Sequence, residues 1–237
     1  MPVGKLSIIV PVYNECETVV PVLKLLEALQ LPGTTQKEIL VVDDASTDNS
    51  TAVIKDYFRQ SNFPFILIQH SENKGKGGSI ITGLGALTGD YFIIQDADLE
   101  LNPEDIITMV SAVNSNRADV VYGSRFLNGS PAPFSLSKLA NTFLTWFSNF
   151  SFGTRLTDME TCYKLIPVSA MDNILLKEQR FGFEPEITAK LARNKSLRFF
   201  EVPIRYSART SLEGKKIGWK DGFRAVWCIV KYGWLGK

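Results

Sequence analysis

The feature that most constrains the fold is a regular alternation, over the first half of the chain, of short β-branched runs with longer segments of helical spacing. This alternation is typical of βα units that build a mostly parallel sheet. The runs are apolar on both faces, as expected where helices cover both sides of such a sheet. The expected strands are Leu6–Pro11, Glu38–Val42, Phe65–Gln69, Tyr91–Gln95 and Val120–Tyr122, and the expected helices are Glu17–Leu29, Asp48–Arg59, Gly78–Leu87 and Pro103–Ser115.

The second half has a different pattern, with aromatic helical segments and one late strand. It contains no linker rich in Pro, Gly or Ser, no repeat and no low-complexity stretch. A chain of 237 residues can bury a full core in one α/β domain, so we expect residues 1–237 to form a single domain. The expected elements are helices Leu136–Phe152, Glu184–Arg193 and Trp219–Gly236, and a strand at Leu197–Ile204.

The charge balance and the cysteine content exclude several classes of function. With 26 basic and 25 acidic residues there is no global field, so a nucleic-acid partner recognised by bulk charge is not expected. Cys16, Cys162 and Cys228 are widely spaced and His70 is the single histidine, which leaves neither a zinc site nor a histidine-based triad. Reduced thiols in a cytosolic setting are the simplest account.

The amino terminus leads directly into the first expected strand and leaves no room for a signal sequence. No apolar run approaches the ~20 residues needed to span a bilayer. We therefore expect a soluble or peripheral protein, which does not exclude membrane substrates.

Three carboxylates, Asp96, Asp98 and Glu100, stand at alternate positions where the fourth expected strand ends. In an extended segment alternate side chains share a face, so the three are expected to converge on one small volume. Crowded anions are tolerable around a hard cation, and Mg²⁺ or Mn²⁺ prefers oxygen ligands completed by the phosphates of a substrate. The alternative for such a cluster alone is a solvated acidic turn.

Polar residues also follow the three earlier strands. Ligands of open α/β sheets bind outside the carboxyl ends of the strands, so these residues are expected to share one rim. After the second strand, Ser46 or Thr47 is expected to cap the next helix, and an aspartate there is suited to accept hydrogen bonds from a nucleobase. The segments are Asn14-Glu15, Asp43-Asp44 and Asn73-Lys74.

A glycine-rich segment, Asn73–Ser79, precedes the third expected helix. Its backbone N–H groups and lysines are suited to face an anion. The spacing of a Walker loop is absent, and glycine-rich helix starts are also common for packing reasons.

Several of these segments, taken together, resemble family 2 glycosyltransferases, which have the GT-A fold. The later segments resemble the dolichyl-phosphate mannose synthase branch, which transfers a sugar to a polyprenyl phosphate. The resemblance covers nearly the whole chain. The segments that carry it are Pro11–Glu15, Asp43–Ser46, Asn73–Gly75, Asp96–Asp98, Gly123–Arg125, Asp158–Lys164 and Val202–Arg205 through Glu213–Trp219.

The resemblance implies roles for the donor half, residues 1–125. Asp44 would meet the base, and Asp96, Asp98 and Glu100 would hold Mg²⁺ or Mn²⁺ on the donor's pyrophosphate. Glu100 stands where the mannose synthases often carry glutamine, so this site gains a charge. The further residues expected to bind the nucleotide sugar are Pro11, Tyr13, Glu15, Asp43, Lys74, Gly75 and Ala97.

The resemblance also gives a purpose to basic residues in the acceptor half, residues 126–237, and just before it. An acceptor phosphate approaching a donor diphosphate requires neutralisation before the atoms come within ~3 Å. For the basic loop alone, an exposed solvated loop is the alternative. The residues expected to bind the acceptor phosphate are Arg125, Lys164, Arg209, Lys215 and Lys216.

The acceptor decides whether a catalytic base is needed. A phosphate monoester is already nucleophilic, whereas a sugar hydroxyl requires a carboxylate base. Asp158 lies in the motif that the family places near the acceptor, and with Asp98 and Arg125 it forms the expected catalytic set. Glu184 and Glu186 are the other candidate bases, or else acids favoured at a helix start.

The aromatic stripe Phe143, Trp146, Phe147 and Phe150 is expected to lie in the core. The alternative is a surface that shelters an isoprenoid chain or rests among lipid headgroups, near Lys138, Lys220, Arg224 and Lys231.

From this sequence we predict inverting, metal-dependent transfer of a hexose from a nucleotide sugar, of the GDP-mannose or UDP-glucose type, to a polyprenyl phosphate. The predicted place is the cytoplasmic face of a membrane, with a membrane-anchoring partner protein as an open possibility. Two alternatives remain: a family 2 transferase acting on a saccharide hydroxyl, and a nucleotide-sugar-binding module without catalysis.

Overall fold

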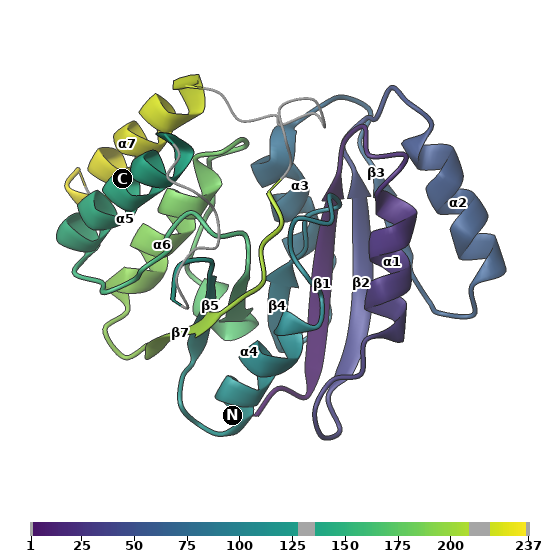
Figure 1. The fold of residues 1–237 in the computed structure, drawn as a ribbon, viewed down its shortest axis with the longest axis horizontal. Coiled ribbons are helices and arrows are strands. Elements are labelled where there is room, and N and C mark those ends of the chain that lie inside the picture. Colours follow the sequence, from purple (N-terminus) through teal and green to yellow (C-terminus); the bar gives the residue numbers. More distant parts are fainter. Residues whose placement is uncertain (1, 128–135, 209–218, 236–237) are drawn as a thin grey trace.

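The computed structural model describes residues 2–127, 136–208 and 219–235, and its strands form one seven-stranded sheet in the order β3-β2-β1-β4-β6-β5-β7 (Figure 1). The strands are β1 (Lys5–Val12), β2 (Gln36–Asp43), β3 (Ile66–Gln69), β4 (Tyr91–Ile94), β5 (Val120–Ser124), β6 (Lys164–Pro167) and β7 (Phe199–Pro203). The helices are α1 (Val19–Ala28), α2 (Ser50–Gln60), α3 (Gly75–Leu84), α4 (Asp105–Asn114), α5 (Leu136–Phe152), the 3₁₀ turn η1 (Val168–Met171), α6 (Phe183–Arg193) and α7 (Trp219–Gly233).

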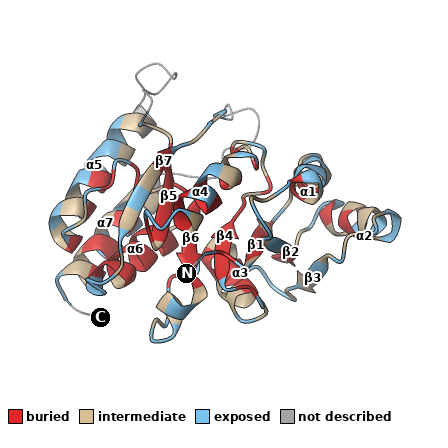
Figure 2. Ribbon diagram, turned by 90° about the horizontal axis from the view of Figure 1, so that it is seen from below, coloured by how far each residue is buried: buried red, intermediate tan, exposed pale blue. Residues whose placement is uncertain are grey.

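The predicted alternation of strands and helices is confirmed, and so is the mostly parallel sheet. β1 pairs in parallel with both β2 and β4, and β2 pairs in parallel with β3. Leu6, Ile8, Ile9 and Val10 of β1 are all fully buried, which means that both faces of this strand are covered. In Figure 2 the strands at the centre of the sheet are correspondingly red.

β6 runs antiparallel between β4 and β5 and is not among the strands predicted from the sequence. Lys164 opens this four-residue strand and Pro167 closes it, so the run is too short to display either an alternating or a helical pattern. Because β6 runs against its neighbours, its first residue lies at the edge of the sheet where β4 ends. The segment that leads into β6 therefore comes to the rim where ligands were expected.

The third helix begins at Gly75 and not at Gly78 as predicted. Gly75 has a φ of +82°, which a glycine adopts at little cost. The N–H groups of Lys74 and Gly75 both donate to the carboxylate of Asp44, at 2.8 and 2.7 Å. This carboxylate supplies the helix start that local sequence signals did not reveal.

The prediction that the aromatic stripe of α5 lies in the core is wrong for three of its four members, whereas Phe147 is partly buried and packs against the core. Phe143, Trp146 and Phe150 are 51, 62 and 71% exposed, whereas Leu144 and Ser148 on the other side of the helix are buried. Helices α5, α6 and α7 pack against one another at one end of the sheet (Figure 1). The opposite side of α5 makes these contacts, and no further described layer covers the stripe.

Helix α7 has the same arrangement. Cys228, Ile229 and Tyr232 are buried against the rest of the protein, while Phe223 and Trp227 are 70 and 50% exposed. Helical spacing alone identifies an apolar face but does not show whether that face is buried or exposed. Within the described residues no helix is both long enough and apolar enough to cross a membrane.

Candidate active site

The loops after β1 and β2 lie together at the carboxyl edge of the sheet. The side-chain oxygen of Asn14 accepts a hydrogen bond from the N–H of Thr47 at 2.8 Å, and the N–H of Asn14 donates to the hydroxyl of Ser46 at 3.0 Å. Ser46 and Thr47 therefore join two loops. The expectation that one of them caps α2 is wrong. Asp48 instead accepts from the N–H of Ser50 at the start of that helix, at 2.9 Å.

The residues predicted to line the nucleoside pocket lie at the ends of β1 and β2 and on the loops that follow them. Tyr13 is 36% exposed and Pro11 is half-buried, so both present surface at the rim. The carboxylate of Glu15 accepts a hydrogen bond from the hydroxyl of Thr18 at 2.7 Å. Asp43 is buried and accepts from the N–H of Ser46 at 3.1 Å, so it holds its own loop in shape.

Asp44, predicted to meet the base, is 2% exposed and organises the start of α3. Besides the N–H groups of Lys74 and Gly75, it contacts His70, whose Nδ1 lies 2.7 Å from Asp44 Oδ1. The other ring nitrogen of His70, Nε2, lies 2.8 Å from the hydroxyl of Thr82. Contact between Asp44 and a nucleobase stays a prediction. The base would have to approach a carboxylate that already has three hydrogen-bond partners, the N–H groups of Lys74 and Gly75 and the ring of His70.

The glycines at the start of α3 serve close packing. A Cβ at Gly77 would lie 2.2 Å from the carbonyl oxygen of Glu178, and one at Gly75 would lie 2.6 Å from that of Gln179. The N–H of Gly78 donates to the same Gln179 carbonyl at 2.9 Å. Several N–H groups that were expected to face an anion are thus occupied within the protein, although the predicted roles of Lys74 and Gly75 with the donor remain untested.

The acidic segment after β4 is a turn, not an extended strand, because Leu99 has a φ of +60°. Alternate residues of this segment therefore do not share a face as they would in a strand. The N–H of Glu100 donates to Asp98 Oδ1 at 3.2 Å. Burial and the nearby carboxylate of Glu100 raise the pKa of Tyr206. In the part of the chain that the structure describes, no three His, Cys, Asp or Glu side chains are grouped closely enough to hold a metal ion.

Asp96 is instead paired with Lys76, one of the two lysines of the glycine-rich segment that were expected to face an anion. The Nζ of Lys76 lies 2.9 Å from Asp96 Oδ1 and 3.4 Å from Glu184 Oε1. Burial acts to lower the pKa of Lys76, but Asp96 and Glu184 outweigh it and raise the pKa well above its ordinary value. This ammonium group brings the first carboxylate of the acidic turn together with the first turn of α6.

Arg125 and Asp158, both predicted to be catalytic, form a buried pair. The Nε and Nη2 atoms of Arg125 donate to the two oxygens of Asp158 at 2.7 and 2.8 Å, and the Arg125 N–H donates as well, at 3.1 Å. Burial opposes the charge of Arg125, but Asp158 raises the pKa of the guanidinium group. Asp158 is fully buried, so it positions Arg125. A direct role of either residue in catalysis stays a prediction.

Lys164 is fully buried at the start of β6, where it donates to the carbonyl of Thr161. Burial lowers the pKa of Lys164, while Glu184 and Glu160 oppose that change. Burial and Glu184 raise the pKa of Glu160 to about 8. In this structure Lys164 is not exposed to a phosphate, and its predicted role there would need a change of side-chain conformation.

Glu184 and Glu186 open α6 but have different surroundings. Glu186 accepts from the N–H groups of Lys177 and Glu178 and from the ammonium group of Lys190, so it fixes the preceding loop. One carboxylate oxygen of Glu184 is buried without a hydrogen-bond partner among the described residues.

The remaining predicted residues divide into two groups. Ala97 is part of the acidic turn and is buried there. Arg209, Lys215 and Lys216 lie outside the described residues. The chain leading to Arg209 is held at the acidic turn, because the N–H of Ser207 donates to the carbonyl of Glu100 at 2.9 Å.

One residue of the site, His70, was missed although the sequence carried a usable signal for it. His70 directly follows β3, so the rule that polar residues at strand ends share the rim would have included it. Lys76 lies in the glycine-rich segment that was expected to face an anion, but its pairing with Asp96 across 20 residues leaves no local pattern.

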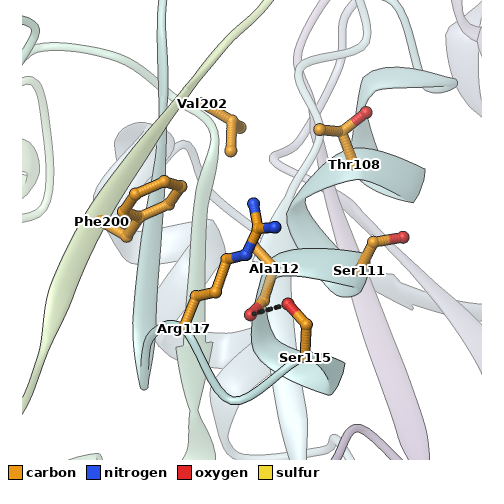
Figure 3. A pocket seen from close by; sticks show the side chains of 7 residues that line it. All are labelled: Thr108, Ser111, Ala112, Ser115, Arg117, Phe200 and Val202. Atoms are coloured by element: carbon orange, nitrogen blue, oxygen red, sulfur yellow. Dashed lines mark hydrogen bonds between the residues drawn. The ribbon is translucent and has the colours of Figure 1, made fainter.

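A cavity of about 280 Å³ lies elsewhere, between α4 and β7 (Figure 3). The guanidinium group of Arg117 points into the space between that helix and the strand. None of the predicted site residues lines this cavity, so it is separate from the rim. Its lining residues are Thr108, Ser111, Ala112, Ser115, Arg117, Phe200 and Val202.

The chain is similar in sequence to a family of enzymes and in fold to several solved structures. The sequence model described as "Glycosyl transferase family 2" matches residues 7–173. Glucosyl-3-phosphoglycerate synthase from Mycobacterium tuberculosis, solved with Mn²⁺, UDP and glucosyl-3-phosphoglycerate, is similar with a TM-score of 0.72 and 14% identity over 97% of this chain and 80% of that one. S. aureus TarS 1-349 in complex with UDP is similar with a TM-score of 0.66 and 19% identity over 96% of this chain and 65% of that one. At these identities the likeness concerns the fold, and it confirms the predicted GT-A fold.

Proposed function

Because the chain belongs to glycosyl transferase family 2 and is therefore a glycosyltransferase, we propose that it transfers a hexose from a nucleotide sugar to a polyprenyl phosphate at a membrane surface. This is the branch-level activity that the sequence resemblance implies. Family membership sets aside the third reading, a sugar-nucleotide-binding module without catalysis.

The observation that carries the proposal is an exposed aromatic face on α5 and α7. Trp146 stacks on Phe150 at 6.3 Å between ring centroids, and Trp234 meets the edge of Phe150 at 6.5 Å, so the rings of the two helices form one surface. Contiguous exposed apolar surface of this kind marks an interaction site, and tryptophan favours the boundary between lipid and water. The members of this aromatic face are Leu139, Phe143, Trp146, Phe150, Phe223, Trp227, Trp234 and Leu235, each 50% exposed or more.

In the donor half we propose a divalent cation held by two carboxylates, where the sequence suggested three. Mg²⁺ is often held by one or two carboxylates together with substrate phosphates, and Mn²⁺ accepts similar ligands. Asp98 and Asp96 fit this requirement as hard oxygen donors, while Glu100 is directed toward Tyr206 and fits it less well. A bound ion would neutralise charge on the departing nucleoside diphosphate.

The solved structures of glucosyl-3-phosphoglycerate synthase contain Mn²⁺ or Mg²⁺ with UDP. By analogy we propose a divalent ion for this chain as well.

Basic residues would neutralise the acceptor phosphate. Arg125 is held in place by Asp158, and Arg209, Lys215 and Lys216 follow the segment anchored to the acidic turn. An oxygen of the phosphate attacks C1 of the hexose, the bond from C1 to the diphosphate oxygen breaks, and its electron pair leaves with the nucleoside diphosphate. The phosphate needs no base for this attack. Inversion at C1 rests on the family resemblance alone.

The first experiment is transfer of labelled hexose from GDP-mannose or UDP-glucose into vesicles that contain a polyprenyl phosphate. With Mn²⁺ present, we expect the label in the lipid fraction, and we expect Asp98→Ala to abolish the transfer while leaving the fold intact. Asp56→Ala, at an exposed position of α2, is the matched control. Full activity of Asp98→Ala in excess EDTA would show that the metal role is wrong.

The membrane part of the proposal has its own test. Trp146→Ser and Phe150→Ser remove exposed rings, so we expect weaker vesicle binding with unchanged donor affinity. Vesicle flotation measures the binding. Equal flotation of wild type and both variants would contradict a peripheral position on the cytoplasmic leaflet, with or without an anchoring partner.

A second candidate function is transfer to a saccharide hydroxyl, which requires a base. The observation in its favour is the buried carboxylate of Glu184 beside Lys76 and Asp96. Loss of turnover in Glu184→Gln with unchanged donor affinity would favour it. Glu186→Gln is the matched control, because that carboxylate is already fixed by the loop before α6.

A further inference from the structure

Two buried carboxylate oxygens beside the acidic turn have no hydrogen-bond partner among the described residues. They are Glu184 Oε2 and Glu160 Oε1. A buried acceptor left unsatisfied costs roughly 1–3 kcal/mol, so such oxygens generally meet a donor from water or from a ligand. Within the described residues their pairing is therefore incomplete, and a hydroxyl donor from a ligand or from water would complete it.

Several contacts place this pair next to the rim. Glu184 Oε1 lies 3.4 Å from the Nζ of Lys76, which in turn lies 2.9 Å from Asp96 of the acidic turn. Glu160 precedes Cys162, whose thiol donates to the carbonyl of Ile94, the last residue of β4, at 3.5 Å. Both carboxylates thus lie where the fourth parallel strand ends, beside the expected position of the donor diphosphate.

The surrounding charges determine what such a group of atoms accepts. Glu184 is only 5% exposed and faces the ammonium group of Lys76. Burial and the nearby Glu184 raise the pKa of Glu160 to about 8. Lys164 is buried beneath them and donates to a backbone carbonyl. Both oxygens keep lone pairs that suit hydroxyl donors, and the carboxylate of Glu184 repels another carboxylate.

We propose that Glu184 and Glu160 form the subsite for the donor hexose, accept hydrogen bonds from its ring hydroxyls and exclude sugars that carry a carboxylate. The inference rests on the proposed function, since it assigns the sugar subsite of the same donor. The phosphate acceptor requires no base, which leaves Glu184 for this role. The sugar is then a neutral, hydroxyl-rich hexose and not a uronic acid.

The test compares dissociation constants by calorimetric titration with Mn²⁺ for UDP, UDP-glucose and UDP-glucuronate, and for GDP, GDP-mannose and GDP-mannuronate. Wild type should bind the neutral sugar nucleotide of the correct base at least about tenfold more tightly than the uronate of the same base, given the cost of juxtaposed like charges. Glu184→Gln and Glu160→Gln should reduce that ratio several-fold and leave the affinity for the free nucleotide within about twofold. Asp172→Asn, exposed in the loop after η1, is the matched control and should leave every ratio unchanged.

Three outcomes decide between the proposals. Equal binding of hexose and uronate by wild type overturns the subsite, and this comparison needs no variant to fold. An unchanged ratio in both folded variants also overturns it and leaves the two oxygens to ordered water. Failure of every nucleotide and nucleotide sugar to bind instead contradicts the proposed donor, and with it the proposed function.

Discussion

Glu178 links the helix that carries part of the aromatic face to the start of α3. Its carboxylate accepts hydrogen bonds from Arg224 at 2.6 Å, Lys231 at 2.9 Å and Tyr232 at 2.8 Å, all on α7. Its own carbonyl oxygen lies 2.2 Å from the position that a Cβ on Gly77 would take, so the same residue packs against the first turn of α3. Replacement by glutamine keeps the shape and removes the charge.

The expected magnitude follows from the pKa of Glu178. Burial acts to raise this pKa, but Lys231, Arg224 and Tyr232 outweigh it and lower the pKa from 4.5 to about 2. At about 1.4 kcal/mol per pKa unit, that difference is worth on the order of 3 kcal/mol. The Arg224 side chain is 51% exposed, so solvent screening reduces the contribution, and we expect Glu178→Gln to lose about 2 kcal/mol.

The pH dependence gives the prediction its sign. Because the pKa is lower in the folded state than in the unfolded state, the contribution is fully present above about pH 4.5 and is lost as the pH falls through about 2. The difference in unfolding free energy between wild type and Glu178→Gln should therefore fall by about half between pH 7 and about pH 3.

Urea denaturation followed by circular dichroism measures this difference at each pH. Asp172→Asn, an exposed carboxylate on the same connecting segment, is the control and should change stability by less than about 0.5 kcal/mol. A gap below about 0.5 kcal/mol at pH 7, or a gap that does not vary with pH, would refute the reasoning.

Three further predictions concern other contacts. Gly77→Ala should lower the free energy of unfolding by at least about 2 kcal/mol in thermal denaturation, because the added Cβ would lie 2.2 Å from the carbonyl oxygen of Glu178. Gly222→Ala in α7 is the control. Its added Cβ meets open space, so this variant should be neutral or more stable by about 0.5–1 kcal/mol. Asp44→Asn should weaken nucleotide binding and cost about 1–3 kcal/mol of stability, since it weakens the cap of α3, and unchanged affinity in calorimetric titration would contradict this. Phe150→Ser should change the free energy of unfolding by no more than about 0.5 kcal/mol, because its ring is 71% exposed, and a larger loss in urea denaturation would mean that the ring supports the fold.

The parallel part of the fold was accessible from the sequence because each strand from β1 to β5 is an apolar run bounded by turn residues and followed by a helical pattern. Such signals are local, so they need no knowledge of partners. β6 has no comparable signal, since its four residues become a strand only because β4 and β5 leave a gap between them. Its position is a tertiary property.

The candidate site was predictable in its location but not in its pairings. The rule that ligands lie beyond the carboxyl ends of parallel strands brought Asp44 and Asp96 to the same edge. The assumption that residues 96–100 continue as an extended strand failed, because Leu99 turns the chain. The partners of those carboxylates, His70 and Lys76, come from other elements and are invisible to local spacing.

The aromatic helices illustrate a different limit. Spacing along α5 identifies a stripe that contains Trp146 and Phe150, but the same spacing describes a buried face and an exposed one. The distinction depends on which side of the helix fits the neighbouring helices, and the small residues Ser148 and Thr145 on the opposite side allow that close packing. Only the assembled structure therefore identifies the aromatic face as surface.

The order of the strands also affects how the domain can be divided. The boundary at residue 125 would assign β5 to the donor half, yet β5 has β6 and β7 as its neighbours and is separated from β4 by β6. The acceptor half likewise supplies Glu184 to the acidic turn, and Gln179 to the start of α3 through the N–H of Gly78. Removal of residues 126–237 would leave β4 with an unpaired edge and would expose Lys76 without one of its two carboxylate partners. We therefore infer that the two halves fold as one unit, because residues of both meet at the proposed donor site.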